Sequence, residues 1–128
     1  MLRLLGAHIG VTLQSERIHL PDGAYVDVDG VCTNPPALVE AWAHQGPPKS
    51  AQRNKILGDA LKLAHVNTVL GTGHRLILCF SDEAACAPFT GRSWYAGAIR
   101  TLGIETHVVT LPDNLVKDIL AAQQRQYR

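Results

Sequence analysis

Residues 37–64, ALVEAWAHQGPPKSAQRNKILGDALKLA, decide the fold of this 128-residue chain. In the first part of the stretch, side chains alternate between two faces, with Glu40 and Trp42 on the same face, and this period of two predicts a strand. Gly and Pro at 45–48 end that strand. From 50 to about 66 the apolar residues recur at helical spacing, so a helix follows the strand directly.

The residues before this stretch predict two more strands and a first helix. Short β-prone runs at 17–20 and 24–29 flank Pro21-Asp22-Gly23, a turn sequence in which Pro presets φ and Gly accepts a positive φ. Together with 37–44 they predict an antiparallel meander, with a turn region over 30–36. Residues 2–14 carry apolar side chains at the spacing of one helix face.

The second half of the chain predicts a parallel α/β arrangement. The run 75–80 is almost continuously apolar, as in a strand buried on both faces, and 106–111 is similar. Helices are expected over 93–102, with Ser93 as N-cap, and from Asp113 to the end. The inner face of that last helix is expected to hold four apolar residues: Leu115, Ile119, Leu120 and Ala122. We therefore predict a single α/β domain over 1–128, a mixed sheet with helices on both faces.

Composition restricts the function classes without choosing one. Hydrophobic residues make up 46% and charged residues 18%, which indicates a folded chain. A formal net charge of +1 does not indicate a nucleic-acid or membrane partner. No apolar run approaches the roughly 18 residues needed to cross a bilayer. Three cysteines without a C-x-x-C pair predict reduced thiols in a cytoplasmic protein, and we interpret Cys79 and Cys86 as packing residues.

Carboxylates on neighbouring strands form the first candidate site. Asp27 and Asp29 lie on one predicted strand and Glu40 on the next, and adjacent strands are about 4.8 Å apart. Such carboxylates can converge on Mg²⁺, which prefers oxygen ligands. For the two aspartates taken alone, a solvated face near a turn is the interpretation that the pattern favours. The pattern around Glu40 fits a metal ligand or an exposed-face residue.

Basic residues at the start of the long helix form a second candidate. Lys49 and Arg53 share the angular sector of the apolar stripe and should point toward the sheet edge, and Gln52 lies at the border of this sector. Their stems could equally pack while the charged heads reach solvent. Three further residues form an outer stripe, interpreted as a solvated face: Lys55, Asp59 and Lys62.

A third candidate is the sequence 90–95, which places Arg92 and two aromatic residues at the start of a helix. It could contact a phosphate or a partner. Burial of Trp94 against the core is the interpretation that the pattern favours.

The element order and these residues resemble the PD-(D/E)XK nuclease superfamily, which has the restriction-endonuclease-like fold. The resemblance covers about residues 1–112 and rests on a helix, three strands, a helix and a strand, with an acid on the second strand and Glu40 on the third. The blocks 38–63, LVEAWAHQGPPKSAQRNKILGDALKL, and 76–109, LILCFSDEAACAPFTGRSWYAGAIRTLGIETHVV, resemble small uncharacterised actinobacterial proteins of that fold.

The resemblance implies a role for each matching residue. Asp29 (or Asp27) matches the metal-binding acid, and Glu40 matches the acid of the E-x-K pair. Trp42 stands where that pair has its lysine. The remaining implied roles are a replacement lysine, a supporting polar residue on the helix and an optional first acid: Lys49 or Lys55, Gln52, and Glu16.

The expected function is therefore a Mg²⁺-dependent nuclease that hydrolyses DNA phosphodiester bonds. The alternative is a catalytically inactive module of the same fold that binds nucleic acid or protein, and a third hypothesis is a helper subunit. Small domains gain stability by pairing, so we expect a homodimer.

Overall fold

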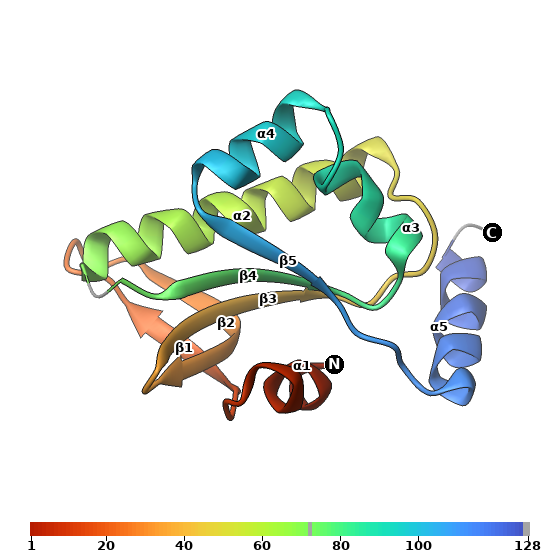
Figure 1. The fold of residues 1–128 in the computed structure, drawn as a ribbon, viewed down its shortest axis with the longest axis horizontal. Helices are drawn as coiled ribbons and strands as arrows, with labels where there is room; N and C mark the ends of the chain where they lie inside the picture. The colour runs from red at the N-terminus through yellow and green to blue at the C-terminus, as the bar shows by residue number, and fades with distance from the viewer. Residues whose placement is uncertain (72, 127–128) are drawn as a thin grey trace.

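The computed structural model describes residues 1–71 and 73–126 and has a five-stranded sheet at its centre (Figure 1). The strands lie in chain order: β1 (Gln14–His19), β2 (Tyr25–Thr33), β3 (Pro36–Trp42), β4 (Arg75–Phe80) and β5 (Ile104–Val108). Pairing is antiparallel from β1 to β3 and parallel from β3 to β5. The predicted meander and the mixed sheet are confirmed.

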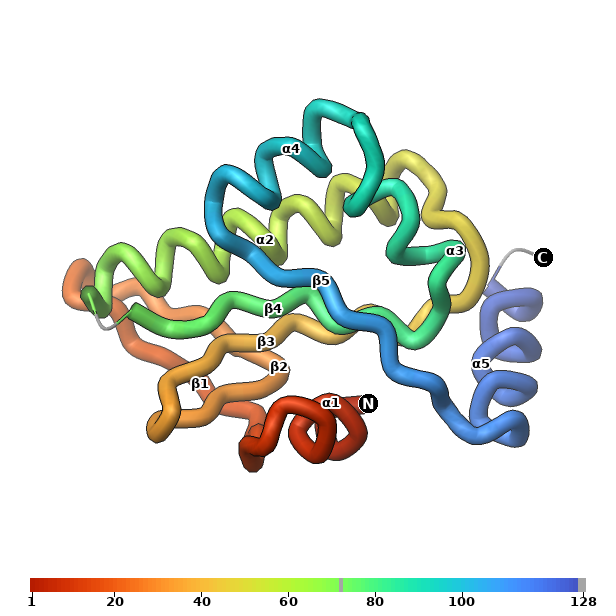
Figure 2. Tube along the Cα trace, in the orientation of Figure 1, coloured from red at the N-terminus to blue at the C-terminus, as the bar shows by residue number. Residues whose placement is uncertain are grey.

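Helices cover both faces of the sheet, which confirms the predicted α/β class. The helical elements are α1 (Leu2–Ile9), α2 (Ser50–Leu70), α3 (Glu83–Cys86), the 3₁₀ turn η1 (Ala87–Phe89), α4 (Trp94–Thr101) and α5 (Asp113–Gln126). Figure 2 shows α1 on one side of the strands, α2 and α4 on the other, and α5 beyond the end of the sheet. None of the described helices combines the length and the apolar character that crossing a membrane requires.

Alternation along the central strands divides the core between two layers. On β3, Leu38 packs toward α2 and Val39 packs toward α1, and both are fully buried. On β4, Phe80 joins the α2 layer while Ile77 joins the α1 layer. Strand β4 is therefore buried on both faces, as its apolar run predicted.

Two predicted boundaries differ because of packing. Residues 30–33, expected in a turn, continue β2, and a Cβ on Gly30 would come within 2.9 Å of Leu2 and 3.3 Å of Leu13. This glycine therefore makes room for α1 rather than a turn. The last strand lies at 104–108 instead of 106–111 and forms a sheet edge with Val108 exposed.

Two expectations about helix faces are wrong. None of the described residues of α5 is buried, so its predicted inner face lies against no core, and Leu115 and Leu120 are each 44% exposed. Trp94 is 76% exposed rather than buried. Because Ala96 and Ile99 dock α4 on the core, the residue two positions before Ala96 points outward.

The smaller expectations hold. Ser93 caps α4, since its side chain accepts a hydrogen bond from the Ala96 amide. Cys79 and Cys86 are free and buried, and burial raises the pKa of both thiols, that of Cys79 to about 11. Both are packing residues. Gly71 ends α2 in the left-handed conformation, and residue 72 lies outside the described residues.

Candidate functional site

The candidate site begins where β2 leaves β3. Backbone pairing of the two strands runs from Thr33 to Gly30 on β2. Further along, Asp29 Oδ2 accepts a hydrogen bond from the Ala41 amide of β3 at 2.9 Å. A side-chain carboxylate thus takes the place of a backbone carbonyl in the ladder. This contact fixes Asp29 beside β3 while the side chain stays exposed.

Glu40 lies beside Asp29 and is one of the few charged residues inside the fold. It is 5% exposed and sits on β3 in the layer under α2, between Leu38 and Trp42 along the strand. Burial raises the pKa of Glu40 to about 8, helped by the hydrogen bond and the charge of the Asp29 carboxyl and opposed by Lys62. Two carboxyl groups held close together are more stable when one of them keeps its proton than when both are negatively charged.

Lys62 of α2 completes the group. Its Nζ forms an ion pair with Glu40 Oε1 and donates a hydrogen bond to the Asp27 carbonyl oxygen at 2.8 Å. Asp59 Oδ1 is 3.9 Å from the same nitrogen. One ammonium group therefore ties α2 to both β2 and β3.

The predicted solvated face of α2 is wrong at this point. The side chains of Lys62 and Asp59 are only 24% and 18% exposed. Because Lys55, Asp59 and Lys62 are spaced i, i+4 and i+7, they do share one stripe. The docking angle of α2 turns the far end of that stripe toward the split between β2 and β3.

The other sequence candidates lie away from the acid pair. The carboxylate of Asp27 is in an ion pair with Arg17 at 2.8 Å and is 63% exposed. Lys49 is the exposed N-cap of α2, and its amide donates to Gln52 Oε1 at 2.9 Å. Gln52 thus caps the helix. Lys55 Nζ lies 3.2 Å from Asp59 Oδ2, so Asp59 stands between Lys55 and Lys62.

Trp42, which stands where the E-x-K pattern has its lysine, is a core residue. Trp42 is 8% exposed in the core under α2, and the ring of His44 stacks on it with centroids 4.5 Å apart. Lys55 Nζ lies 5.9 Å from the centre of the Trp42 ring. A lysine at 42 would have to be buried, whereas Lys62 reaches Glu40 from the helix with its stem partly covered.

Sequence reasoning missed Lys62, although two signals pointed to a lysine of α2. Glu40 lies in an apolar strand, where an unpaired carboxylate is costly and a cationic partner is expected. The long helix supplies two lysines and an arginine, and a third lysine stands at its N-cap. Choosing among them needs the docking angle of the helix, which periodicity does not contain.

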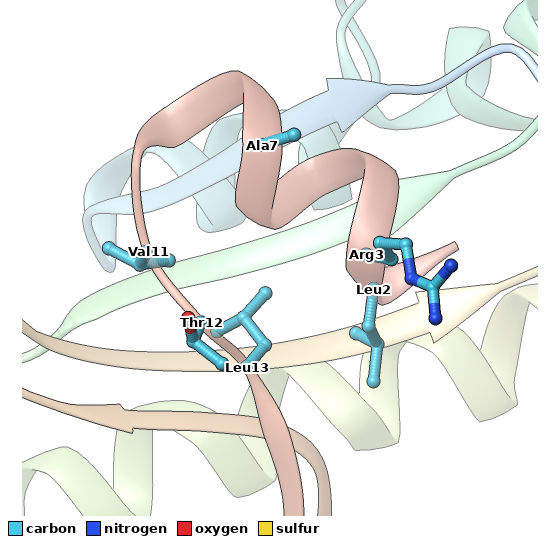
Figure 3. A pocket seen from close by; sticks show the side chains of 6 residues that line it. All are labelled: Leu2, Arg3, Ala7, Val11, Thr12 and Leu13. Atoms are coloured by element: carbon cyan, nitrogen blue, oxygen red, sulfur yellow. The ribbon is translucent and has the colours of Figure 1, made fainter.

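A hollow of about 380 Å³ lies elsewhere, beside α1 (Figure 3). Arg3 is the one charged residue in its described lining. The lining residues are Leu2, Arg3, Ala7, Val11, Thr12 and Leu13. Glu16 of β1 is exposed and lines a separate hollow with Gln14 and Cys32. Neither lining includes the Asp29–Glu40 pair, so the optional first acid is not brought to it.

The donor set of the pair suits one hard cation. Within residues 1–71 and 73–126, no three His, Cys, Asp or Glu side chains gather as a metal site. Mg²⁺ typically uses one or two protein carboxylates and completes its octahedron with water and phosphate oxygens. Asp29 and Glu40 can supply that number of carboxylates.

Comparison of the chain with protein-family models, with curated proteins and with solved structures finds no match.

Proposed function

We propose that this chain is a restriction-endonuclease-like domain that hydrolyses DNA phosphodiester bonds with Mg²⁺. The observation that carries the proposal is the convergence of Asp29, Glu40 and Lys62 where β2 leaves β3. The antiparallel meander followed by a helix and a parallel strand is consistent with that fold.

Each residue of the group has a distinct task in this proposal. Asp29, fixed by the Ala41 amide, and Glu40 are the carboxylates that hold the metal ion. A bound Mg²⁺ would neutralise charge on the phosphodiester and activate water. Lys62 replaces the lysine expected at Lys49 or Lys55. Its hydrogen bond to the Asp27 carbonyl keeps the ammonium in place when Glu40 turns to the metal ion, so Lys62 can hold a phosphate oxygen or the attacking water.

The charge state of Glu40 links metal binding to proton release. With its pKa at about 8, Glu40 is largely protonated at neutral pH in the absence of a cation. A divalent ion binds the ionised form, so ion binding removes that proton. Asp29 and Glu40 can then both be negative at the site.

A specific observation favours the second candidate, a catalytically inactive module. Lys62 already occupies the Glu40 carboxyl group, and Trp42 fills the usual lysine position. In that case the Glu40–Lys62 pair only ties α2 to the sheet, and the chain would bind nucleic acid or protein without cleavage.

Cleavage of plasmid DNA in Mg²⁺ or Mn²⁺ separates the two candidates. We expect Glu40→Gln and Asp29→Asn to lower the cleavage rate by about 100-fold. Asp27→Asn is the matched control, because it removes a carboxylate from the same strand that points to Arg17, and it should retain activity. Absence of cleavage by the wild-type protein, or equal cleavage by Glu40→Gln, would reject the nuclease.

A further inference from the structure

A second surface of the molecule presents an exposed tryptophan among arginines. We define the Trp94 surface as Arg53 of α2 with Arg92, Trp94 and Tyr95 at the start of α4. Trp94 is 76% exposed, the most exposed of the large hydrophobic side chains in the described part of the chain. The indole presents more apolar area than any other side chain, so such exposure is unusual in a folded domain.

The residues beneath Trp94 are firmly held. Tyr95 packs on buried Phe89, with ring centroids 5.8 Å apart, and meets the Trp94 ring edge-on at 5.5 Å. The Arg53 guanidinium carbon lies 5.9 Å from the centre of the Tyr95 ring, and Nη2 donates to Ser50 Oγ at 3.3 Å. Trp94 therefore stands against a packed ring, Tyr95, which has a cation at 5.9 Å.

The charge around this surface has one sign. Neither 41–58 nor 84–104 contains an aspartate or glutamate. The two stretches, joined by the Arg53–Tyr95 contact, hold four basic residues besides Lys55, which pairs with Asp59 on the other flank of α2: Lys49, Arg53, Arg92 and Arg100. A whole-chain charge of +1 conceals this local excess. The arginines and the exposed Trp94 ring together favour a polyanionic ligand that also carries flat apolar groups.

We propose that the Trp94 surface binds single-stranded nucleic acid, with an unpaired base stacked on Trp94 and neighbouring phosphates on Arg53 and Arg92. Exposed aromatic rings beside cations are how proteins hold unpaired strands, because every base has a face that can stack. In a duplex those faces are covered by neighbouring bases. A protein partner fits less well, because a single exposed ring among cations offers little apolar area.

This surface is separate from the acid pair, so the proposal does not depend on the proposed nuclease. Arg53 and Lys62 are nine residues apart on α2, which places them about 180° apart around the helix axis. Arg53 contacts α4, whereas Lys62 contacts β2 and β3. A strand on Trp94 would lie on the other flank of α2 from Glu40.

Fluorescence anisotropy with labelled oligothymidylate and oligouridylate of about 15 nucleotides tests the proposal. EDTA in the buffer prevents any metal-dependent cleavage, and a duplex of equal length is the competitor. We expect both single strands to bind better than the duplex, with the ratio of the two showing whether DNA or RNA is preferred. Binding should quench the fluorescence of Trp94.

Matched variants distinguish stacking from apolar contact. Trp94→Leu keeps an apolar side chain without a ring and should weaken single-strand binding about tenfold, whereas Trp94→Phe should restore most of it. Arg92→Gln should lower the slope of log K against log salt by about 0.7. Arg125→Gln, an equal charge change on exposed α5, should leave binding within about twofold.

Three results would overturn the proposal. The first is equal affinity of Trp94→Leu and wild type. The second is a duplex that binds as tightly as either single strand. The third is saturable self-association that shields Trp94 from iodide while neither oligonucleotide binds, which would assign the surface to contact between copies of this chain.

Discussion

Lys62 and Glu40 form an ion pair across the interface between α2 and β3, and Glu40 is the one buried carboxylate among the described residues. The Lys62 side chain is half-buried, and Glu40 is only 5% exposed. Asp29 of β2 forms a hydrogen bond with the same Glu40 carboxyl group. Burial favours the neutral form of Glu40, Asp29 adds to that effect, and Lys62 opposes it.

Glu40 should make the stability of the protein depend on pH. Its pKa is raised from 4.5 to about 8, so its contribution is fully present below pH about 4.5 and is lost as the pH rises through 8. We expect Glu40→Gln to change little at pH 5 and to gain about 4 kcal/mol relative to wild type between pH 5 and pH 9. Thermal unfolding of both proteins in EDTA measures this. A pH-independent difference would contradict the raised pKa.

Loss of Lys62 should be costly, because it leaves Glu40 without its cation. We expect Lys62→Met to lower the free energy of unfolding at pH 8 by about 2 kcal/mol, since a buried acceptor then lacks its partner. Lys55→Met is the control: Lys55 is 65% exposed in its pair with Asp59, so its loss should cost under about 1 kcal/mol. Urea unfolding compares them. Equal losses would mean that the Glu40–Lys62 pair is no stronger than a surface pair.

Metal affinity should rise steeply with pH. If Glu40 is a ligand with a pKa of about 8, the dissociation constant of Mg²⁺ or Mn²⁺ should fall about tenfold per pH unit below 8 and level off above it. Calorimetric titration at pH 6, 7 and 9 measures this dependence. A constant affinity over that range would place the ion away from Glu40.

The convergence of Asp29 with Glu40 followed from the sequence, because neighbouring strands bring their side chains within reach. Lys62 did not, because helical periodicity fixes directions around the helix axis and leaves the docking on the sheet undetermined. Trp94 was missed for a related reason: two adjacent aromatic residues cannot both face the core, and the sequence alone did not show that Tyr95 does. The apolar face of α5 was recognised, but the sequence did not show that the helix leaves this face uncovered by the core.

The expected homodimer can be tested at that face. Leu115 and Leu120 of α5 are each 44% exposed, and pairing of two copies would bury them. We expect sedimentation at tens of micromolar to show a dimer, and Leu120→Glu to be monomeric. Leu61→Glu, a change at a 67%-exposed leucine of α2, is the control and should remain dimeric. A wild-type monomer at that concentration would contradict the expectation.

A crystal structure of the wild-type protein soaked in Mn²⁺ above pH 8 tests the metal site most directly. We predict one anomalous peak about 2.2 Å from a carboxylate oxygen of both Asp29 and Glu40, with the Lys62 ammonium still on the Asp27 carbonyl. An unchanged Glu40–Lys62 ion pair with no peak beside it, at a Mn²⁺ concentration that saturates other sites, would contradict the proposed metal site.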